Sequence, residues 1–124
     1  MKRPLKQIAF EFASQISDLN IWSVILFGSV AQAKTHEESD IDCLVALDTE
    51  EDPSSEVIEH IGWIAADLEA TYGIALQIVY TNRLYEGLDP YFLQKVLGEG
   101  VVLFARSPQV ILNGVAVRPY TVLS

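Results

Sequence analysis

Cysteine is nearly absent from this 124-residue chain, which carries Cys43 alone. A single thiol excludes an internal disulfide framework and favours a reducing compartment, so we expect a cytoplasmic protein. No charged start is followed by a long apolar stretch, which argues against a signal peptide and a membrane span. Half of the residues are apolar. A chain of this size and composition is predicted to form one domain whose core needs no disulfide or metal.

Positive charge is also scarce. The chain has eight Lys and Arg residues and seventeen Asp and Glu residues, which gives a net charge of −9. Such a field repels nucleic acid, so direct nucleic-acid binding is not expected. A free nucleotide is anionic too, but a metal ion can bridge it to an acidic site. The charge also suits a basic protein partner, or it serves only solubility, and composition does not choose between these two.

One stretch of the chain carries candidate chemistry. The apolar run Val24–Phe27 stops at Gly28-Ser29, as a buried strand does where it ends in a tight turn. A second apolar run, Ile41–Leu47, begins directly after Asp40. The period of two in a strand puts Asp40 and Asp42 on one face, with their backbones roughly 7 Å apart. The two carboxylates therefore point the same way.

Hard carboxylate oxygens without neighbouring His or Cys ligands suit Mg²⁺ or Mn²⁺, which a protein holds through one or two carboxylates together with substrate phosphates. Gly28 allows a backbone to approach a phosphate closely, and Ser29 offers a hydroxyl and an N–H group where a helix could begin. The Gly28-Ser29 turn and the Asp40–Asp42 pair together predict a phosphate site that faces a metal site.

This pattern, Gly28-Ser29 followed ten residues later by Ser39-Asp40-Ile41-Asp42, resembles the polymerase-beta-type nucleotidyltransferase superfamily. The likeness is greatest to the minimal nucleotidyltransferases, which often act as antitoxins beside an all-helical toxin of the HEPN type. It implies an α/β (α+β) nucleotidyltransferase fold, with a mixed twisted sheet and helices mainly on one face. It also implies that Asp40 and Asp42 are catalytic and hold metal, while Gly28, Ser29 and Ser39 bind the nucleotide. From the residues alone, we expect Ser39 to fix the turn into the strand by bonding local backbone rather than to contact substrate.

The resemblance implies transfer of a nucleoside monophosphate from a nucleoside triphosphate, ATP above all, to a hydroxyl on a partner protein. Three positions depart from the family pattern. Gln32 and Ala33 stand where Arg and Gly usually follow the serine turn, and Gln77 stands where active members place a third carboxylate. An amide oxygen can bind a metal but cannot act as a base. The alternative is a catalytically degenerate binding protein that neutralises its partner by direct contact.

The rest of the chain predicts a covering layer of helices and two further strands. Helices are expected over 4–19, over 55–72 with Ser54 or Ser55 as cap and Gly73 as stop, and from Asp89-Pro90 to Gly98. Strands are expected over 74–80 and 101–105. This nucleotidyltransferase-like domain would span 1–105.

Residues 106–124 form a C-terminal extension of the same domain, in which Asn113-Gly114 between two apolar triplets predicts a hairpin. The extension docks on its own domain or joins another chain, so a homo- or hetero-oligomer stays open. Arg83 and Lys95 are candidates to contact a triphosphate, although the sequence gives no geometry for either. His36 is expected to be a solvated loop side chain rather than a base or ligand.

Overall fold

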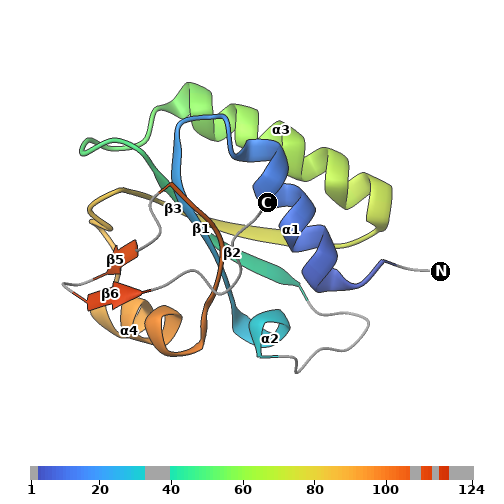
Figure 1. Cartoon of the computed structure of the whole chain (residues 1–124). Coiled ribbons are helices and arrows are strands. Elements are labelled where there is room, and N and C mark those ends of the chain that lie inside the picture. Colours follow the sequence, from blue (N-terminus) through green and yellow to red (C-terminus); the bar gives the residue numbers. More distant parts are fainter. Residues whose placement is uncertain (1–2, 33–39, 107–109, 113–114, 118–124) are drawn as a thin grey trace.

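A four-stranded sheet forms the centre of the computed structural model, which describes residues 3–32, 40–106, 110–112 and 115–117 (Figure 1). The strands stand in the order β3-β2-β1-β4. Their bounds are Ile21–Phe27 for β1, Ile41–Leu47 for β2, Leu76–Asn82 for β3 and Val101–Ala105 for β4. Strand β2 runs parallel to β3, whereas β1 is antiparallel to both β2 and β4. The mixed sheet expected from the sequence is confirmed.

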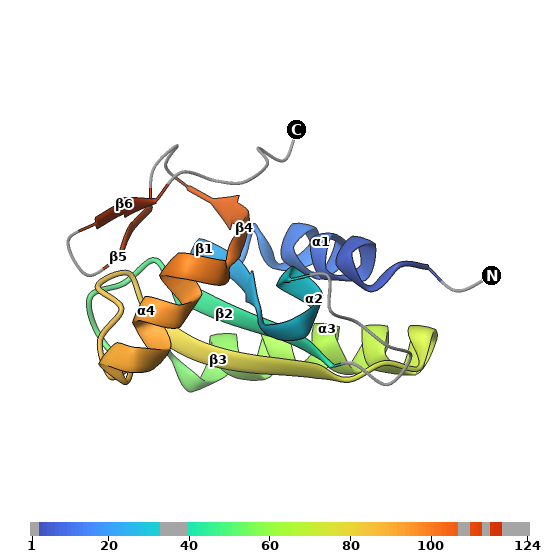
Figure 2. The same ribbon diagram turned by 90° about the horizontal axis from the view of Figure 1, so that it is seen from below.

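Two long helices, α1 (Leu5–Ile16) and α3 (Ser55–Tyr72), cover one face of this sheet (Figures 1 and 2). Their buried side chains pack with alternate residues of β1 and β2 into one apolar cluster. Phe12 of α1 lies at its centre with no exposed surface. This cluster is the main source of burial energy, because each fully buried large side chain contributes about 1.5–3 kcal/mol.

The opposite face is covered by one shorter helix, α4 (Pro90–Glu99). Its Leu93 and Val96 pack on Ile25 and Leu44 in a second, smaller cluster. The buried Tyr85 belongs to the same cluster, and its hydroxyl forms a 2.8 Å hydrogen bond with the Ser23 hydroxyl. Burial raises the pKa of Tyr85 to about 12, so this phenol stays protonated.

The helix ends follow the signals in the sequence. The Ser54 hydroxyl accepts a hydrogen bond from the Glu56 N–H, and Gly73 ends α3 in the left-handed conformation at φ +65°. The Asp89 side chain accepts from the first N–H groups of α4, and proline occupies the first turn of that helix. The expected capping residues are confirmed, because serine and aspartate satisfy free N–H groups and glycine tolerates a positive φ.

Some boundaries differ from the expected ones. Helix α1 ends at Ile16 rather than at 19, and Asn20 takes a positive φ of 61° before β1 begins at Ile21. Strand β3 begins two residues later than expected and extends through Asn82. It extends because its ladder with β2 continues to the pair Leu47 and Asn82. The Asn82 side chain then accepts hydrogen bonds from two N–H groups of the following turn.

Three short elements complete the described structure. Helix α2 (Gly28–Ala31) follows β1 directly. Strands β5 (Val110–Leu112) and β6 (Val115–Val117) pair with each other in an antiparallel two-stranded sheet. Residues 113 and 114, where the hairpin turn is expected, lie outside the described residues. Among the described helices, none is both long and apolar enough to cross a membrane.

Candidate functional site

Three neighbouring strands bring one residue each to the same row of the sheet. Phe27 at the end of β1 is paired in register with Asp42 of β2, and Asp42 is paired with Gln77 of β3. The residues that follow on β2, Cys43 and Leu44, belong to the clusters on opposite faces. Because side chains alternate along a strand, Asp42 points to the α4 face of the sheet. The alternation of side chains that the sequence predicts for this strand is therefore present in the structure.

Asp40 lies directly before β2 and contacts the same row. The side-chain amide of Gln77 donates a hydrogen bond of 3.1 Å to Asp40 Oδ2. The structure thus brings together Asp40, Asp42 and Gln77, the three positions that the sequence analysis aligned with a metal site. Gln77 is exposed, and both aspartates are half-buried. The cluster opens to solvent, where a ligand can reach it.

The aspartate pair is electrostatically unsatisfied. Partial burial, and then the nearby charge of Asp40, raise the pKa of Asp42 above its usual value. Both effects disfavour the ionised carboxylate, and a bound cation would reverse them. The adjacent Cys43 is different, because complete burial and the Asp42 charge raise the pKa of its thiol to about 12. Cys43 is therefore a core residue and not a nucleophile at neutral pH.

Gly28 is required by its position against Asp42. Its φ is +77°, a conformation that side chains with a Cβ rarely adopt. A Cβ at this position would lie 2.5 Å from Asp42 Oδ2. The backbone of Gly28 therefore borders the aspartate pair directly, and Ser29 follows it, half-buried, in the first turn of α2. Glycine leaves open the space next to the carboxylate.

The described residues supply two carboxylates and one amide to this site. Within residues 3–32 and 40–106 no group of three or more His, Cys, Asp and Glu side chains could hold a metal ion. A two-carboxylate set still fits Mg²⁺ or Mn²⁺, because such ions keep several water or phosphate ligands. Ser39 and His36, named from the sequence, lie outside the described residues, as does Ala33.

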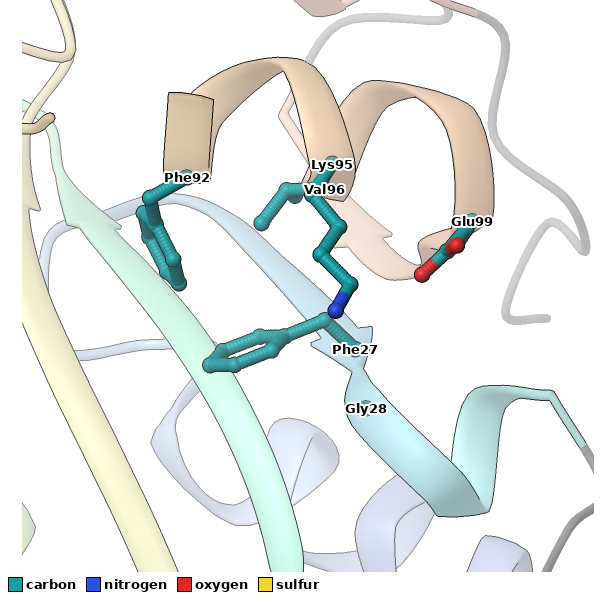
Figure 3. Close-up of a pocket in the computed structure, with 6 residues that line it drawn as sticks. All are labelled: Phe27, Gly28, Phe92, Lys95, Val96 and Glu99. Carbon is teal, nitrogen blue, oxygen red and sulfur yellow. The ribbon is translucent and has the colours of Figure 1, made fainter. Parts of the chain in front are cut away.

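The two residues proposed from the sequence to contact a triphosphate, Arg83 and Lys95, differ in their surroundings. Arg83 forms ion pairs with Asp48 at 3.2 Å and Glu50 at 2.5 Å, so its charge is already compensated. Both carboxylates raise the pKa of Arg83 further through hydrogen bonds. Lys95 instead points from α4 toward the Phe27–Gly28 segment (Figure 3). Only Lys95 of this pair therefore lies where it could reach a ligand beside Gly28.

Lys95 belongs to a cavity of about 210 Å³ between the end of β1 and α4. The lining residues are Phe27, Gly28, Phe92, Lys95, Val96 and Glu99. From the sequence, α4 is expected only as a covering helix, and Phe92 and Glu99 are not among the candidate site residues. Helical periodicity shows which face is apolar, but it does not show that α4 packs next to Gly28, more than sixty residues earlier in the chain.

The comparisons with known proteins agree with this geometry. The profile of the family described as "Polymerase beta, Nucleotidyltransferase" matches residues 7–109. A toxin-antitoxin crystal structure with AMP-PNP superposes with a TM-score of 0.55 at 16% identity, covering 83% of this chain and 75% of that one. A mutant of the toxin-antitoxin complex MntA-HpeT gives a TM-score of 0.56 at 17% identity, with coverages of 85% and 75%.

A crystal structure from Shewanella oneidensis is similar at a TM-score of 0.53 and 14% identity, covering 82% of this chain and 72% of that one. At such low identity these likenesses establish the fold alone. Among curated proteins no sequence matches the chain. The expected nucleotidyltransferase fold is confirmed, and the roles of single residues rest on the geometry described above.

Proposed function

Because the chain belongs to the polymerase beta nucleotidyltransferase family, we propose that it transfers a nucleoside monophosphate from a nucleoside triphosphate to a hydroxyl group. One observation carries the proposal: Asp40, Asp42 and Gln77 meet where the neighbouring strands β2 and β3 begin, beside Gly28. Two carboxylates next to an open glycine backbone suit a metal-bound polyphosphate.

Asp40 and Asp42 would hold Mg²⁺ or Mn²⁺. The raised pKa of Asp42 supports this assignment, because partial burial and the nearby Asp40 charge disfavour two ionised carboxylates and a bound cation would reverse both effects. When bound, the divalent metal would neutralise charge on the phosphates during the displacement. Gln77 would position Asp40 through the hydrogen bond from its amide.

The protein's own part in the reaction is positioning. Gly28 lets the phosphates approach the backbone, and Ser29 supplies a hydroxyl for a hydrogen bond to a phosphate oxygen. Attack of the acceptor oxygen on the α-phosphorus forms one P–O bond and breaks the bond to the departing pyrophosphate. The acceptor proton passes to water, because Gln77 has no basic group at the third position.

ATP is the proposed donor and a helical toxin of the HEPN type is the proposed acceptor. Two similar structures support a nucleotide and a toxin partner: one is a toxin-antitoxin structure with AMP-PNP, and another is a mutant of the toxin-antitoxin complex MntA-HpeT. The HEPN type follows from the family resemblance alone. The net charge of −9 also favours a basic protein as the partner over a nucleic acid. The proposed setting is the cytoplasm, where ATP is available and Cys43 stays reduced.

The test is transfer of labelled nucleotide. The purified protein is incubated with ATP labelled at the α-phosphate, Mg²⁺ or Mn²⁺, and a purified helical toxin of the HEPN type. Covalent labelling of that partner should require the metal and should disappear in Asp40→Ala and Asp42→Ala. Labelling that persists in both variants would contradict the proposed site. The variant Asp18→Ala, which alters an exposed acidic residue in the turn after α1, serves as the control.

A second function, neutralisation of a partner by contact alone, is favoured by two observations. Gln77 lacks the carboxylate that an active member would place there. Moreover, α3 presents Trp63 with 69% of its surface exposed, in a shallow hollow formed with Glu56, Glu59 and His60. An exposed tryptophan among acidic side chains suits a basic protein surface. If contact is sufficient, Trp63→Ala should weaken partner binding while Asp42→Ala leaves it unchanged.

The change Gln77→Asp separates the two functions. It places a third carboxylate in register with Asp42, where it can share the metal. For an enzyme weakened at this position, labelling should rise by roughly 10²-fold or more, the usual contribution of a positioned acid or base. No gain would show that the site lacks more than this one carboxylate. Gln77→Asn tests whether the charge, and not the shorter side chain, is responsible.

A further inference from the structure

We propose that the cavity between β1 and α4 binds the nucleoside end of the nucleotide, with the base against Phe27 and Phe92 and a phosphate on Lys95. This inference rests on the proposed function and specifies its substrate site. The cavity is lined by Gly28 on one side. Gly28 in turn borders Asp42 Oδ2. A ligand that fills the cavity would therefore extend directly to the aspartate pair.

The size of the cavity limits what it can hold. Its volume of about 210 Å³ is below the roughly 300–1,000 Å³ of pockets that enclose a complete drug-sized ligand. It therefore suits part of a nucleotide, with the polyphosphate lying outside along Gly28. The alternative occupant, an apolar side chain of a partner, would leave the lysine without a counter-charge.

The apolar wall of the cavity is aromatic. The rings of Phe27 and Phe92 meet edge to face, with centroids 5.1 Å apart at 87° (Figure 3). The two rings therefore offer a planar base one ring face and one ring edge to pack against. Val96 closes the same wall from α4. Aromatic surfaces bind bases through stacking without requiring a particular sequence of hydrogen-bonding groups.

Lys95 supplies the positive charge. In residues 3–32, 40–106, 110–112 and 115–117, its ammonium has neither a hydrogen bond nor an ion-pair partner. Its side chain extends along the cavity toward the Phe27–Gly28 segment (Figure 3). By contrast, the arginines Arg3, Arg83 and Arg106 each pair with a carboxylate. An ammonium left available beside Gly28 can bind a phosphate oxygen through a charge-assisted hydrogen bond.

A hydrogen bond connects the end of α2 to Glu99, one of the residues that line the cavity. The Gln32 side-chain amide, at the end of α2, donates to Glu99 near the end of α4 at 2.5 Å. The same contact occupies Glu99, which would otherwise compete with a phosphate for Lys95. Gln32, which stands where the family pattern has arginine, does not line the cavity itself but holds Glu99, which does.

The experiment measures two ligands by calorimetry in the presence of Mg²⁺: ATP, which has a base, and pyrophosphate, which has none. Phe92→Leu keeps the apolar packing but removes the aromatic ring, and should weaken ATP binding about fivefold or more while pyrophosphate affinity stays unchanged. Lys95→Gln should weaken both ligands roughly tenfold. Lys95→Arg should retain most of the affinity, because it keeps the charge.

Two controls separate this inference from the proposed function. Lys6→Gln removes the same charge from α1 and should leave both affinities unchanged. Asp42→Ala should abolish binding of both ligands. If Asp42→Ala abolishes binding but Lys95→Gln and Phe92→Leu bind ATP like the unmodified protein, the cavity is not the nucleoside site although the function stands. If the unmodified protein binds neither ligand, the proposed function and this inference both fail.

Discussion

The two faces of the central sheet differ in how completely they are covered. On one face, α1 and α3 lie across the strands and enclose an apolar cluster that includes Phe12 and Ile61, both without exposed surface. On the other face, α4 covers Ile25 and Leu44 but leaves the row at Asp42 and Gln77 open. The same two strands, β1 and β2, supply side chains to both faces.

This difference separates stability from binding. The closed face contributes burial energy and holds the strands in register. The open face presents a pair of carboxylates, a glycine that leaves room beside Asp42, and a cavity with an aromatic wall. Two partly buried carboxylates side by side are costly without a cation. Substitutions on the two faces should therefore have opposite signatures.

The largest effect is expected on the closed face. Phe12→Ala removes a fully buried ring and should lower the free energy of unfolding by about 3–5 kcal/mol. Urea denaturation at constant m-value measures this loss. Affinity for ATP per folded molecule should not change, because Phe12 lies across the sheet from Asp42. A loss below about 1 kcal/mol would show that the closed face is not the main core.

Gly28→Ala should affect both properties. A positive φ costs a residue with a Cβ about 1–2 kcal/mol, and here the Cβ would also meet the Asp42 carboxylate. We expect the unfolding free energy to fall by more than this amount and ATP binding to be lost. Gly73→Ala is the matched control, since it has a φ of +65° and no atom within 4 Å of the added Cβ. It should reproduce only the backbone cost and keep ATP binding.

The smallest stability effect is expected for Asp42→Asn, and it should depend on pH. The pKa of Asp42 is raised in the folded protein, so the folded state is favoured by protonated Asp42 below the ordinary value of 3.8. That advantage is lost as the pH rises through the raised pKa. The variant should therefore be more stable than the unmodified protein near neutral pH, by less than about 1 kcal/mol because the group is half-exposed.

Denaturation curves across this pH range check the sign of the effect. The stability gain of Asp42→Asn should shrink toward zero as the pH falls below about 4. Added Mg²⁺ should also reduce the gain at neutral pH, because only the unmodified pair has two charges to offer a cation. A variant that is less stable than the unmodified protein near pH 7 would contradict the electrostatic description.

Much of the fold and the aspartate row could be predicted, because both depend on local signals. Alternation on β2 placed Asp40 and Asp42 on one face, and the capping residues Ser54 and Asp89 marked helix starts. The strand order could not be derived from such signals. The parallel pairing of β2 and β3 places Gln77 beside Asp42. From the sequence, the link between position 77 and the aspartates came only from the family resemblance.

The cavity was beyond sequence reasoning for a physical reason. It exists because Phe92 and Lys95 on α4 pack next to Phe27 and Gly28, and no periodic pattern encodes that long-range contact. Lys95 was a candidate beside Arg83, and the two are distinguished by the ion pairs of Arg83 and by the place of Lys95 in the cavity lining. The docking of residues 106–124 stays a prediction, as does the role of Ser39.

Calorimetric titration with each of the four nucleoside triphosphates, with and without Mg²⁺, tests the central claim most directly. The unmodified protein is compared with Asp42→Ala, and with Trp63→Ala as the control on α3. The account predicts metal-dependent binding, tightest for ATP, that disappears in Asp42→Ala and persists in Trp63→Ala. Binding that is independent of Mg²⁺ or unaffected by Asp42→Ala, or no binding of any triphosphate, would contradict it and favour a protein that acts by covering its partner.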